Sequence, residues 1–340
     1  MRKLLNTLYI TTPESYISKD GENIVVSVKQ QEVFRISVLN IESIVTLGYM
    51  GASPGAMKLC AERGIGLTFL TTHGRFISRV QGQLRGNVLL RKAQYALSEN
   101  EDVSTEISRI CIAGKIQNYR NILRRFERDY GQNAEVEAVV QEMDRAKRNV
   151  LRAMSKEQVR GLEGDAASSY FSVFPKLIIN QQADFPFCGR NRRPPKDAIN
   201  AMLSLAYTLL TNDITSALEA VGLDPYVGFL HTLRPGRASL ALDMVEELRA
   251  YLGDRFVLSL INRKQISPSD FLYQGEKGVV LTENGRKVFL SAWQMRKKEE
   301  TTHPFLQEKI PVGLIPYAQA MLMARCIRGD IDTYPVFLLK

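Results

Sequence analysis

The feature that most constrains this fold is a change of sequence periodicity near Gly86. Before that point, short β-rich runs alternate with turn signals, and Asp20-Gly21 between two runs is typical of a tight hairpin. After that point, apolar residues recur at helical spacing over long stretches. We therefore predict an α+β protein, with a small N-terminal β-rich domain at 1–86 and a larger all-α domain at 87–340.

The expected elements follow from these two patterns. Strands are predicted at Thr7–Ile10, Tyr16–Lys19, Asn23–Lys29, Glu32–Val38, Ser43–Leu47, Gly66–Leu70 and Arg75–Val80, with one helix at Pro54–Arg63 that ends at Gly64. Further helices are predicted at Val88–Leu97, Ser104–Asp129, Ala134–Ala153, Lys156–Phe174, Asp197–Thr211, Ile214–Val221, Ser239–Ala250 and Pro316–Arg328. The stretch Ile266–Phe289 is expected to be irregular, with a small hairpin at Asn284-Gly285.

Composition indicates a soluble, cytoplasmic protein. Cys60, Cys111, Cys188 and Cys326 are too far apart for a zinc or redox motif, which favours a reducing compartment. The apolar run Ala198–Leu210 falls short of the ~20 residues that a membrane span needs, and the start lacks a cleavable signal pattern.

The charge balance favours a polyanionic partner. The chain has 45 Lys and Arg against 36 Asp and Glu, a net charge of +9. Of the four segments 1–90, 91–160, 161–250 and 251–340, only 161–250 has more acidic than basic residues. A cationic surface around a carboxylate pocket would give this distribution, and so would a basic protein with scattered charge.

Glu163 is the first candidate site residue. The helix that carries it opens with Ser155 and Gln158 at capping-box spacing, and Glu163 borders its apolar stripe. Gly161 and Gly164 flank it at some cost in helix stability, which suggests that another group approaches this backbone closely. A surface glutamate at the edge of a helix is the alternative.

Asp243 and Glu246 lie three residues apart, on one face of a helix that Ser239 is expected to cap. Two carboxylates this close repel each other unless a cation lies between them, and a divalent metal is one such cation. Because Glu247 is also present, an exposed acidic face is the alternative explanation.

The chain has three histidines, at 73, 231 and 303. His73 lies in a turn and His303 precedes a proline, so both are expected to be structural or solvated. The loop from His231 through Arg237 can fold the imidazole back over the helix that carries Asp243. One histidine with two or three carboxylates suits Mn²⁺ or Mg²⁺, although a core or capping histidine would fit the same position.

Four blocks of the chain resemble one known family. They are the opening MRKLLNTLYI, the run RNRRPPKDAINAMLSLAY from Arg190 to Tyr207, the Leu-Glu-Gly around Glu163, and the stretch from His231 to Arg249 with SLALDMVEELR. Together they resemble the CRISPR-associated adaptation integrases, the first-numbered and near-universal CRISPR protein. The N-terminal sequence is most similar to the I-C subtype.

The resemblance implies a site and an activity. Glu163, His231 and Asp243 match the family's catalytic metal ligands, for Mg²⁺ or Mn²⁺, and Glu246 matches a further acidic position. The implied reaction is transesterification, in which the 3′-hydroxyl of a short foreign DNA attacks a phosphodiester of the CRISPR repeat. A general metal-dependent DNA nuclease and a catalytically silent DNA-bridging scaffold are the alternatives.

The resemblance also implies partners. Members form homodimers through the β-rich domain, and a dimer of a small ferredoxin-like adaptation protein bridges two of these dimers. The C-terminal run Tyr334–Leu339 is expected to pack on its own domain, with addition to a partner's sheet edge as the alternative.

Basic side chains near the site are candidates for contacts with DNA phosphates. On one predicted helix, Arg120, Arg124 and Arg128 form a line, although Glu127 and Asp129 could pair with them. The other candidates are loop residues, namely Arg190, Arg192, Arg193, Lys196, Arg234 and Arg237. No base-reading motif is present, so we expect recognition of backbone and shape.

Overall fold

The computed structural model describes residues 6–48, 50–72, 74, 76–80, 82, 88–191 and 194–339. The chain forms two compact units, one of Met1–Arg85 with Leu281–Glu299, the other of Gly86–Val280 with Glu300–Lys340. Helix α9 (Glu283–Lys298) belongs to the first unit, where Gln294 Nε2 donates to the carbonyl oxygen of Thr7 at 2.7 Å. None of the described helices is long and apolar enough to cross a membrane.

The first unit contains two four-stranded sheets. One has the order β1 (Thr7–Ile10), β5 (Ser43–Leu47), β7 (Gly66–Leu70) and β8 (Phe76–Val80); the other has β4 (Gln31–Ser37), β3 (Asn23–Val28), β2 (Ser15–Asp20) and β6 (Gly51–Ala52). The predicted hairpin is confirmed, since β2 and β3 pair in antiparallel register around Gly21, which has a φ of 56°. The N-terminal β-rich region is therefore as the sequence predicts.

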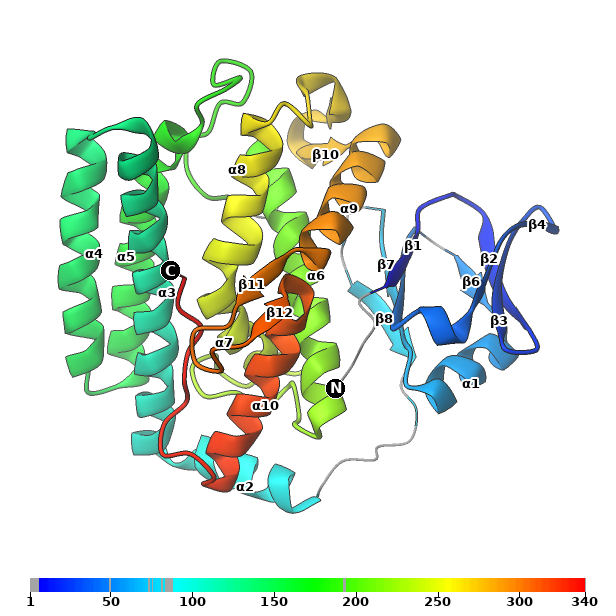
Figure 1. The fold of residues 1–340 in the computed structure, drawn as a ribbon, viewed down its shortest axis with the longest axis horizontal. Helices are drawn as coiled ribbons and strands as arrows, with labels where there is room; N and C mark the ends of the chain where they lie inside the picture. Colours follow the sequence, from blue (N-terminus) through cyan, green and yellow to red (C-terminus); the bar gives the residue numbers. More distant parts are fainter. Residues whose placement is uncertain are drawn as a thin grey trace. The chain divides into compact units, whose positions relative to one another are not determined.

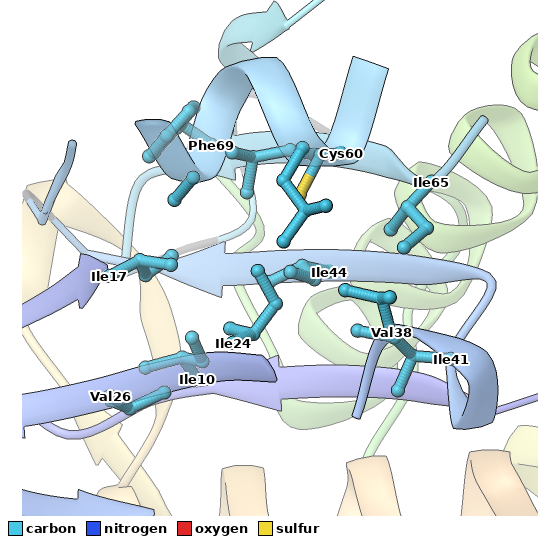
Figure 2. Close-up of a cluster of buried hydrophobic side chains, with 13 residues drawn as sticks. Ile10, Ile17, Ile24, Val26, Val38, Ile41, Ile44, Cys60, Ile65 and Phe69 are labelled. Carbon is cyan, nitrogen blue, oxygen red and sulfur yellow. The ribbon is translucent and has the colours of Figure 1, made fainter. Parts of the chain in front are cut away.

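Helix α1 (Pro54–Arg63) covers the core of this unit. Ser53 Oγ accepts from the Ala56 amide at 3.1 Å to begin the helix, and Gly64, with a φ of 68°, ends it. Figure 2 shows side chains such as Ile24, Ile44 and Cys60 gathered between the helix and the strands. Burial of these apolar side chains holds the helix and the sheets together.

The second unit is built on helices. They are α2 (Val88–Glu99), α3 (Glu101–Tyr130), α4 (Ala134–Arg152), α5 (Lys156–Val173), α6 (Ala198–Val221), α7 (Ser239–Leu248), α8 (Arg255–Asn262) and α10 (Ile315–Arg328), and a π-helical turn at Arg249–Asp254 joins α7 to α8. Helix α3 packs against α4, α5 and α7, and Figure 1 shows α3, α4 and α5 side by side. This arrangement places α5 and α7, which carry Glu163, Asp243 and Glu246, both in contact with α3.

The region expected to be all-α also contains short strands. They are β9 (Phe271–Tyr273), β10 (Val279–Leu281), β11 (Glu300–Thr302) and β12 (Lys309–Pro311), and β11 pairs with β12. The hairpin predicted at Asn284-Gly285 is wrong. Thr282 Oγ1 accepts from the Gly285 amide at 3.0 Å, so this dipeptide lies in the first turn of α9. A capping threonine outweighs the turn preference of Asn-Gly.

Two further predicted boundaries differ from the structure. The helices predicted at Asp197–Thr211 and Ile214–Val221 form one helix, α6, because Asn212 is buried and no glycine or proline interrupts it. Ser239 is the first residue of α7 and not its cap, since Ala238 holds the cap position without a side-chain hydrogen bond.

The C-terminal segment Tyr334–Leu339 packs on its own unit. Asn118 of α3 donates from Nδ2 to the Phe337 carbonyl at 2.8 Å and accepts from the Leu339 amide at 2.7 Å. Tyr334 donates to Glu247 of α7, and the Phe337 amide donates to the same carboxylate at 2.6 Å. Figure 1 shows this segment, in red, running beside α3, as the sequence predicts.

Candidate functional site

His231 is held by the helix that follows it. Its Nδ1 lies 2.6 Å from Asp243 Oδ1, and its backbone amide donates to the same oxygen at 3.0 Å. Asp243 Oδ2 accepts from the amides of Phe229 at 2.6 Å and Leu230 at 3.0 Å. Asp243 is 1% exposed, and these four contacts occupy both of its oxygens. Because those oxygens act as acceptors, the Nδ1 atom of His231 carries a ring proton and donates it to Asp243.

A glycine permits this arrangement. A Cβ added at Gly228 would lie 2.5 Å from Asp243 Oδ2 and 2.7 Å from the Leu240 amide nitrogen. The loop can therefore come close enough to the start of α7 for three consecutive amides to reach one carboxylate only if residue 228 has no side chain.

Glu163 and Glu246 meet through a lysine that the sequence analysis did not single out. Lys115 of α3 forms ion pairs with Glu163 and, at 2.7 Å, with Glu246 Oε2. The Lys115 side chain is 1% exposed, whereas that of Glu163 is 26% exposed. Among the described residues, this buried Glu246 oxygen has no hydrogen-bond partner in addition to the ion pair. Three elements, α3, α5 and α7, therefore contribute to one charge cluster.

Arg249 is the second cation of this cluster. Its Nη2 donates to Glu246 Oε1 at 2.5 Å, and its guanidinium lies 4.9 Å from the centre of the Tyr207 ring. Burial alone would raise the pKa of Glu246, but Arg249 and Lys115 outweigh burial and lower that pKa. Glu246 is therefore ionised at neutral pH.

Polar and charged side chains surround the guanidinium of Arg249. Tyr207 donates to Asp254, and burial raises the pKa of Asp254 to about 6, against the opposing effects of Tyr207 and Arg249. Arg190 lies 5.3 Å from the centre of the same tyrosine ring and donates to Asn200 Oδ1 at 2.6 Å. Two guanidinium groups thus stack on one tyrosine whose hydroxyl is fixed.

A pocket of about 610 Å³ opens beside the cluster. It lies between α5 and the loop that precedes α6, and both Arg190 and Arg249 line it. The Nε atom of Arg249 is buried and has no hydrogen-bond partner in the described chain. Gly164 also lines the pocket, and nothing lies within 4 Å of a Cβ added at Gly161 or Gly164, so the close neighbour expected at these glycines is absent from the described residues.

The structure decides one of the alternatives left open by the sequence. Asp243, Glu246 and Glu247 are 1%, 5% and 0% exposed, so the reading of an exposed acidic face is wrong. The same helix directs Asp243 and Glu246 toward His231 and Lys115, and Glu247 toward the C-terminal segment. The structural reading of His303 is confirmed, since it is buried and its Nε2 lies 3.0 Å from Gln319 Oε1.

The predicted phosphate contacts have different surroundings. On α3, Arg120 pairs with Asp144 at 2.7 Å, Arg124 pairs with Glu137 and Glu127, and Arg128 pairs with Asp129 at 2.9 Å. Lys196 and Arg234 are exposed and Arg237 is half-buried, while Arg190 makes the contacts given above. His73, Arg192 and Arg193 lie outside the described residues. The three α3 arginines are thus paired with carboxylates, whereas Lys196 and Arg234 are exposed loop residues.

The types of donor atom suit a hard divalent ion. Glu163 and Glu246 supply carboxylate oxygens, and His231 supplies Nε2, the ring nitrogen that Asp243 does not contact. As they stand, these described side chains do not form a closed set of three metal-ligating groups. The reason is visible in the contacts, because the Lys115 ammonium lies between the two carboxylates.

Sequence reasoning missed Lys115 and Arg249. Lys115 follows the apolar run Cys111–Gly114 and precedes Ile116, so it lies in a buried part of the helix. A lysine in such a position is rarely unpaired, and this could have indicated a functional contact. Arg249 lies three residues after Glu246, at the spacing of an intrahelical ion pair.

Comparison with known proteins identifies the family. The family described as "CRISPR associated protein Cas1" matches residues 8–295. The chain is 48% identical to CRISPR-associated endonuclease Cas1 1 of Chlorobaculum tepidum and 49% identical to CRISPR-associated endonuclease Cas1 2 of Rhodospirillum rubrum, each over 100% of both chains. A casposase bound to its integration product has a similar fold, with a TM-score of 0.83 at 21% identity over 97% of this chain and 92% of that one. The chain therefore belongs to the Cas1 family of CRISPR-associated proteins.

Proposed function

We propose that this chain is a metal-dependent DNA integrase of CRISPR adaptation, which joins the 3′-hydroxyl ends of short foreign DNA into the CRISPR repeat by transesterification. The observation that carries the proposal is the meeting of Glu163 and Glu246 at Lys115, with His231 held by Asp243, which lies three residues before Glu246 on the same helix, in a chain with a net charge of +9. The names of the relatives, endonucleases and a casposase with its integration product, support phosphodiester chemistry.

Three residues would hold the metal. They are Glu163, Glu246 and His231 through Nε2, and bound Mg²⁺ or Mn²⁺ would supply a Lewis acid that acidifies the attacking hydroxyl and stabilises charge on the phosphoryl oxygens. The sequence names Asp243 as a ligand as well. We assign it instead the positioning of His231, because its two oxygens already accept four contacts.

The chain's own cations have a second task in this proposal. Arg249 lies at the wall of the pocket beside the cluster, and its Nε has no other partner, so it can bind a phosphate oxygen of the DNA. Asp243 keeps the ring proton of His231 on Nδ1, so that the opposite nitrogen stays available. The exposed Lys196 and Arg234 then extend the phosphate-binding surface, with Arg237, Arg192 and Arg193 as further candidates.

The proposed assembly follows the family. We propose that the chain forms a homodimer through its β-rich unit, that a small ferredoxin-like adaptation protein bridges two dimers, and that the chain is of the I-C subtype. The long edge strand β4 supports the first point, since Gln31–Arg35 are all exposed and an edge strand of this length needs a covering partner.

The structure bears differently on the two alternatives, a general DNA nuclease and a catalytically silent scaffold. Hydrolysis by the same site remains the competing activity, because water in place of the 3′-hydroxyl gives cleavage. The silent scaffold assumed that Asp243 and Glu246 were surface charge, and the burial of both removes that basis.

A joining assay tests the proposal. A labelled oligonucleotide with a free 3′-hydroxyl is incubated with a repeat-containing duplex in Mn²⁺, Mg²⁺ or chelator, with and without the small partner protein. We expect a joined product that needs metal and that Glu163→Gln abolishes, while Glu157→Gln, which pairs with Arg160 on the same helix, retains it. Release of fragments without any joined product would overturn the integrase proposal in favour of a nuclease.

A further inference from the structure

Lys115 is a buried cation that contacts two carboxylates at once. It forms ion pairs with Glu163 and Glu246, its side chain is 1% exposed, and its ammonium lies 5.6 Å from the centre of the Tyr119 ring. Helix α3 fixes its backbone, and Gly114 beside it faces the Val336 side chain. The ammonium therefore has a fixed place between the two acidic side chains.

The local charges are already balanced. Glu163 and Glu246 carry two negative charges, and Lys115 and Arg249 carry two positive charges in direct contact with them. Asp243 is turned away to His231 and the loop amides. A divalent ion that entered this cluster would add charge beside two buried cations, which is unfavourable at low dielectric.

We propose that Lys115 competes with the divalent ion for Glu163 and Glu246, so that the site binds metal tightly only when a DNA phosphate is also present. The phosphate supplies negative charge that offsets the metal, and it gives Lys115 a new partner as the carboxylates turn to the ion. Metal and DNA then strengthen each other's binding by the same factor, because linkage between two ligands is reciprocal. This inference rests on the metal site proposed above.

The experiment measures Mn²⁺ binding by the full-length protein, from the electron paramagnetic resonance signal of free Mn²⁺. Each variant is titrated alone and with a repeat-containing duplex whose 3′ ends are dideoxy, so that no joining occurs. We expect the wild type to bind Mn²⁺ at least tenfold more tightly with DNA than without it. Lys115→Met should bind Mn²⁺ without DNA at least tenfold more tightly than the wild type, and DNA should add little.

Three further variants make the result specific. Lys115→Arg keeps the charge and should behave as the wild type. Lys147→Met is the matched control, since Lys147 donates to Gln117 Oε1 of α3 at 2.8 Å and pairs with no carboxylate of the described residues. If circular dichroism in chelator shows that Lys115→Met is unfolded, Lys115→Gln, which keeps a neutral donor, takes its place in the titration.

The outcomes separate the two proposals. The competition is overturned if Lys115→Met binds Mn²⁺ no more tightly than the wild type does, while Glu163→Gln abolishes Mn²⁺ binding. That result would leave the proposed metal site intact. A wild type whose Mn²⁺ binding, with and without DNA, is the same as that of Glu163→Gln overturns the metal site itself.

Discussion

Glu246 and Glu247 are neighbours on α7, and their surroundings are opposite. Glu246 contacts two cations, Lys115 at 2.7 Å and Arg249 at 2.5 Å. Glu247 contacts only neutral donors, namely the Tyr334 hydroxyl, the Gln319 amide and the Phe337 backbone N–H at 2.6 Å. Both side chains are buried, so the difference lies in the partners and not in the depth.

The two carboxyl groups respond in opposite directions. Burial outweighs the neutral donors at Glu247 and raises its pKa to about 7, whereas at Glu246 the effect of burial is overcome by Arg249 and Lys115, and the pKa falls. A carboxylate that stays charged can bind a cation. A carboxyl group held by neutral donors instead fixes the position of a chain segment. The comparison teaches that the neighbouring cations, and not the residue type or the helix position, separate the two roles.

The largest expected effect is on the joining rate, when each of the two carboxylates is replaced in turn by an amide. We expect Glu246→Gln to reduce the joining rate by about a hundredfold or more, because it removes a proposed ligand and leaves two cations without their partner. Glu247→Gln should keep most of the rate, since the Glu247 carboxyl contacts Gln319, Tyr334 and the Phe337 amide and not the two cations. Initial rates in the joining assay, normalised to folded protein, measure both; equal losses would contradict the division of roles.

The next effect concerns the C-terminal segment. Phe337 is 2% exposed, stacks on Tyr251 with ring centres 5.5 Å apart and lies 5.6 Å from the His303 ring. Phe337→Ala should lower the free energy of unfolding by about 4 kcal/mol, because it leaves a cavity in a packed core. Chemical denaturation measures the loss. The exposed neighbour Leu338→Ala is the control and should cost little; equal losses in both variants would argue against a packed segment.

Much of the fold was predictable because it rests on local signals. The hairpin at Gly21 and helix α1 between Ser53 and Gly64 are set by turn and cap residues that act within a few positions. Helices α8 and α9 were missed, since α8 continues α7 through a π-helical turn and α9 begins at an Asn-Gly that resembles a hairpin. The short pairing of β11 with β12 depends on tertiary contacts, which no local pattern reveals.

Some contacts of the predicted site residues could be expected from the sequence, and others could not. The pairing of His231 with Asp243 follows from a loop that returns to the next helix, and the sequence indicates that loop. The position of Lys115 between Glu163 and Glu246 joins residues 48 positions apart or more, so only the packing of α3 against α5 and α7 brings them together. The sequence predicted a metal between the acidic residues, and it did not predict the lysine.

The pH dependence of stability sharpens the same comparison. Burial raises the pKa of Glu247 from 4.5 to about 7 in the folded state, so the folded protein binds a proton here that the unfolded chain lacks between those values. The protonated Glu247 carboxyl therefore contributes to the free energy of unfolding at pH values below 4.5. This contribution, on the order of 3 kcal/mol in total, is lost as the pH rises through about 7.

The variant Glu247→Gln removes this dependence, so it isolates the group from others that titrate in the same range, such as Asp254. We expect the free energy of unfolding of the wild type, relative to the variant, to be greater at pH 5 than at pH 8, as measured by chemical denaturation at both pH values. A difference that does not change with pH would mean that Glu247 titrates alike in both states.

The smallest effect extends the comparison from acidic to basic side chains. Arg234 is exposed in the loop after His231, whereas Arg124 pairs with Glu127 at 3.0 Å and with Glu137. Arg234→Gln should weaken DNA binding a few-fold and reduce the slope of log affinity against log salt by about 1, because it removes one phosphate contact. Arg124→Gln should leave the slope unchanged, since carboxylates already neutralise that charge. Salt titrations of binding to one duplex decide between them, and a reduced slope for Arg124→Gln would show that the ion pairs of α3 open to bind DNA.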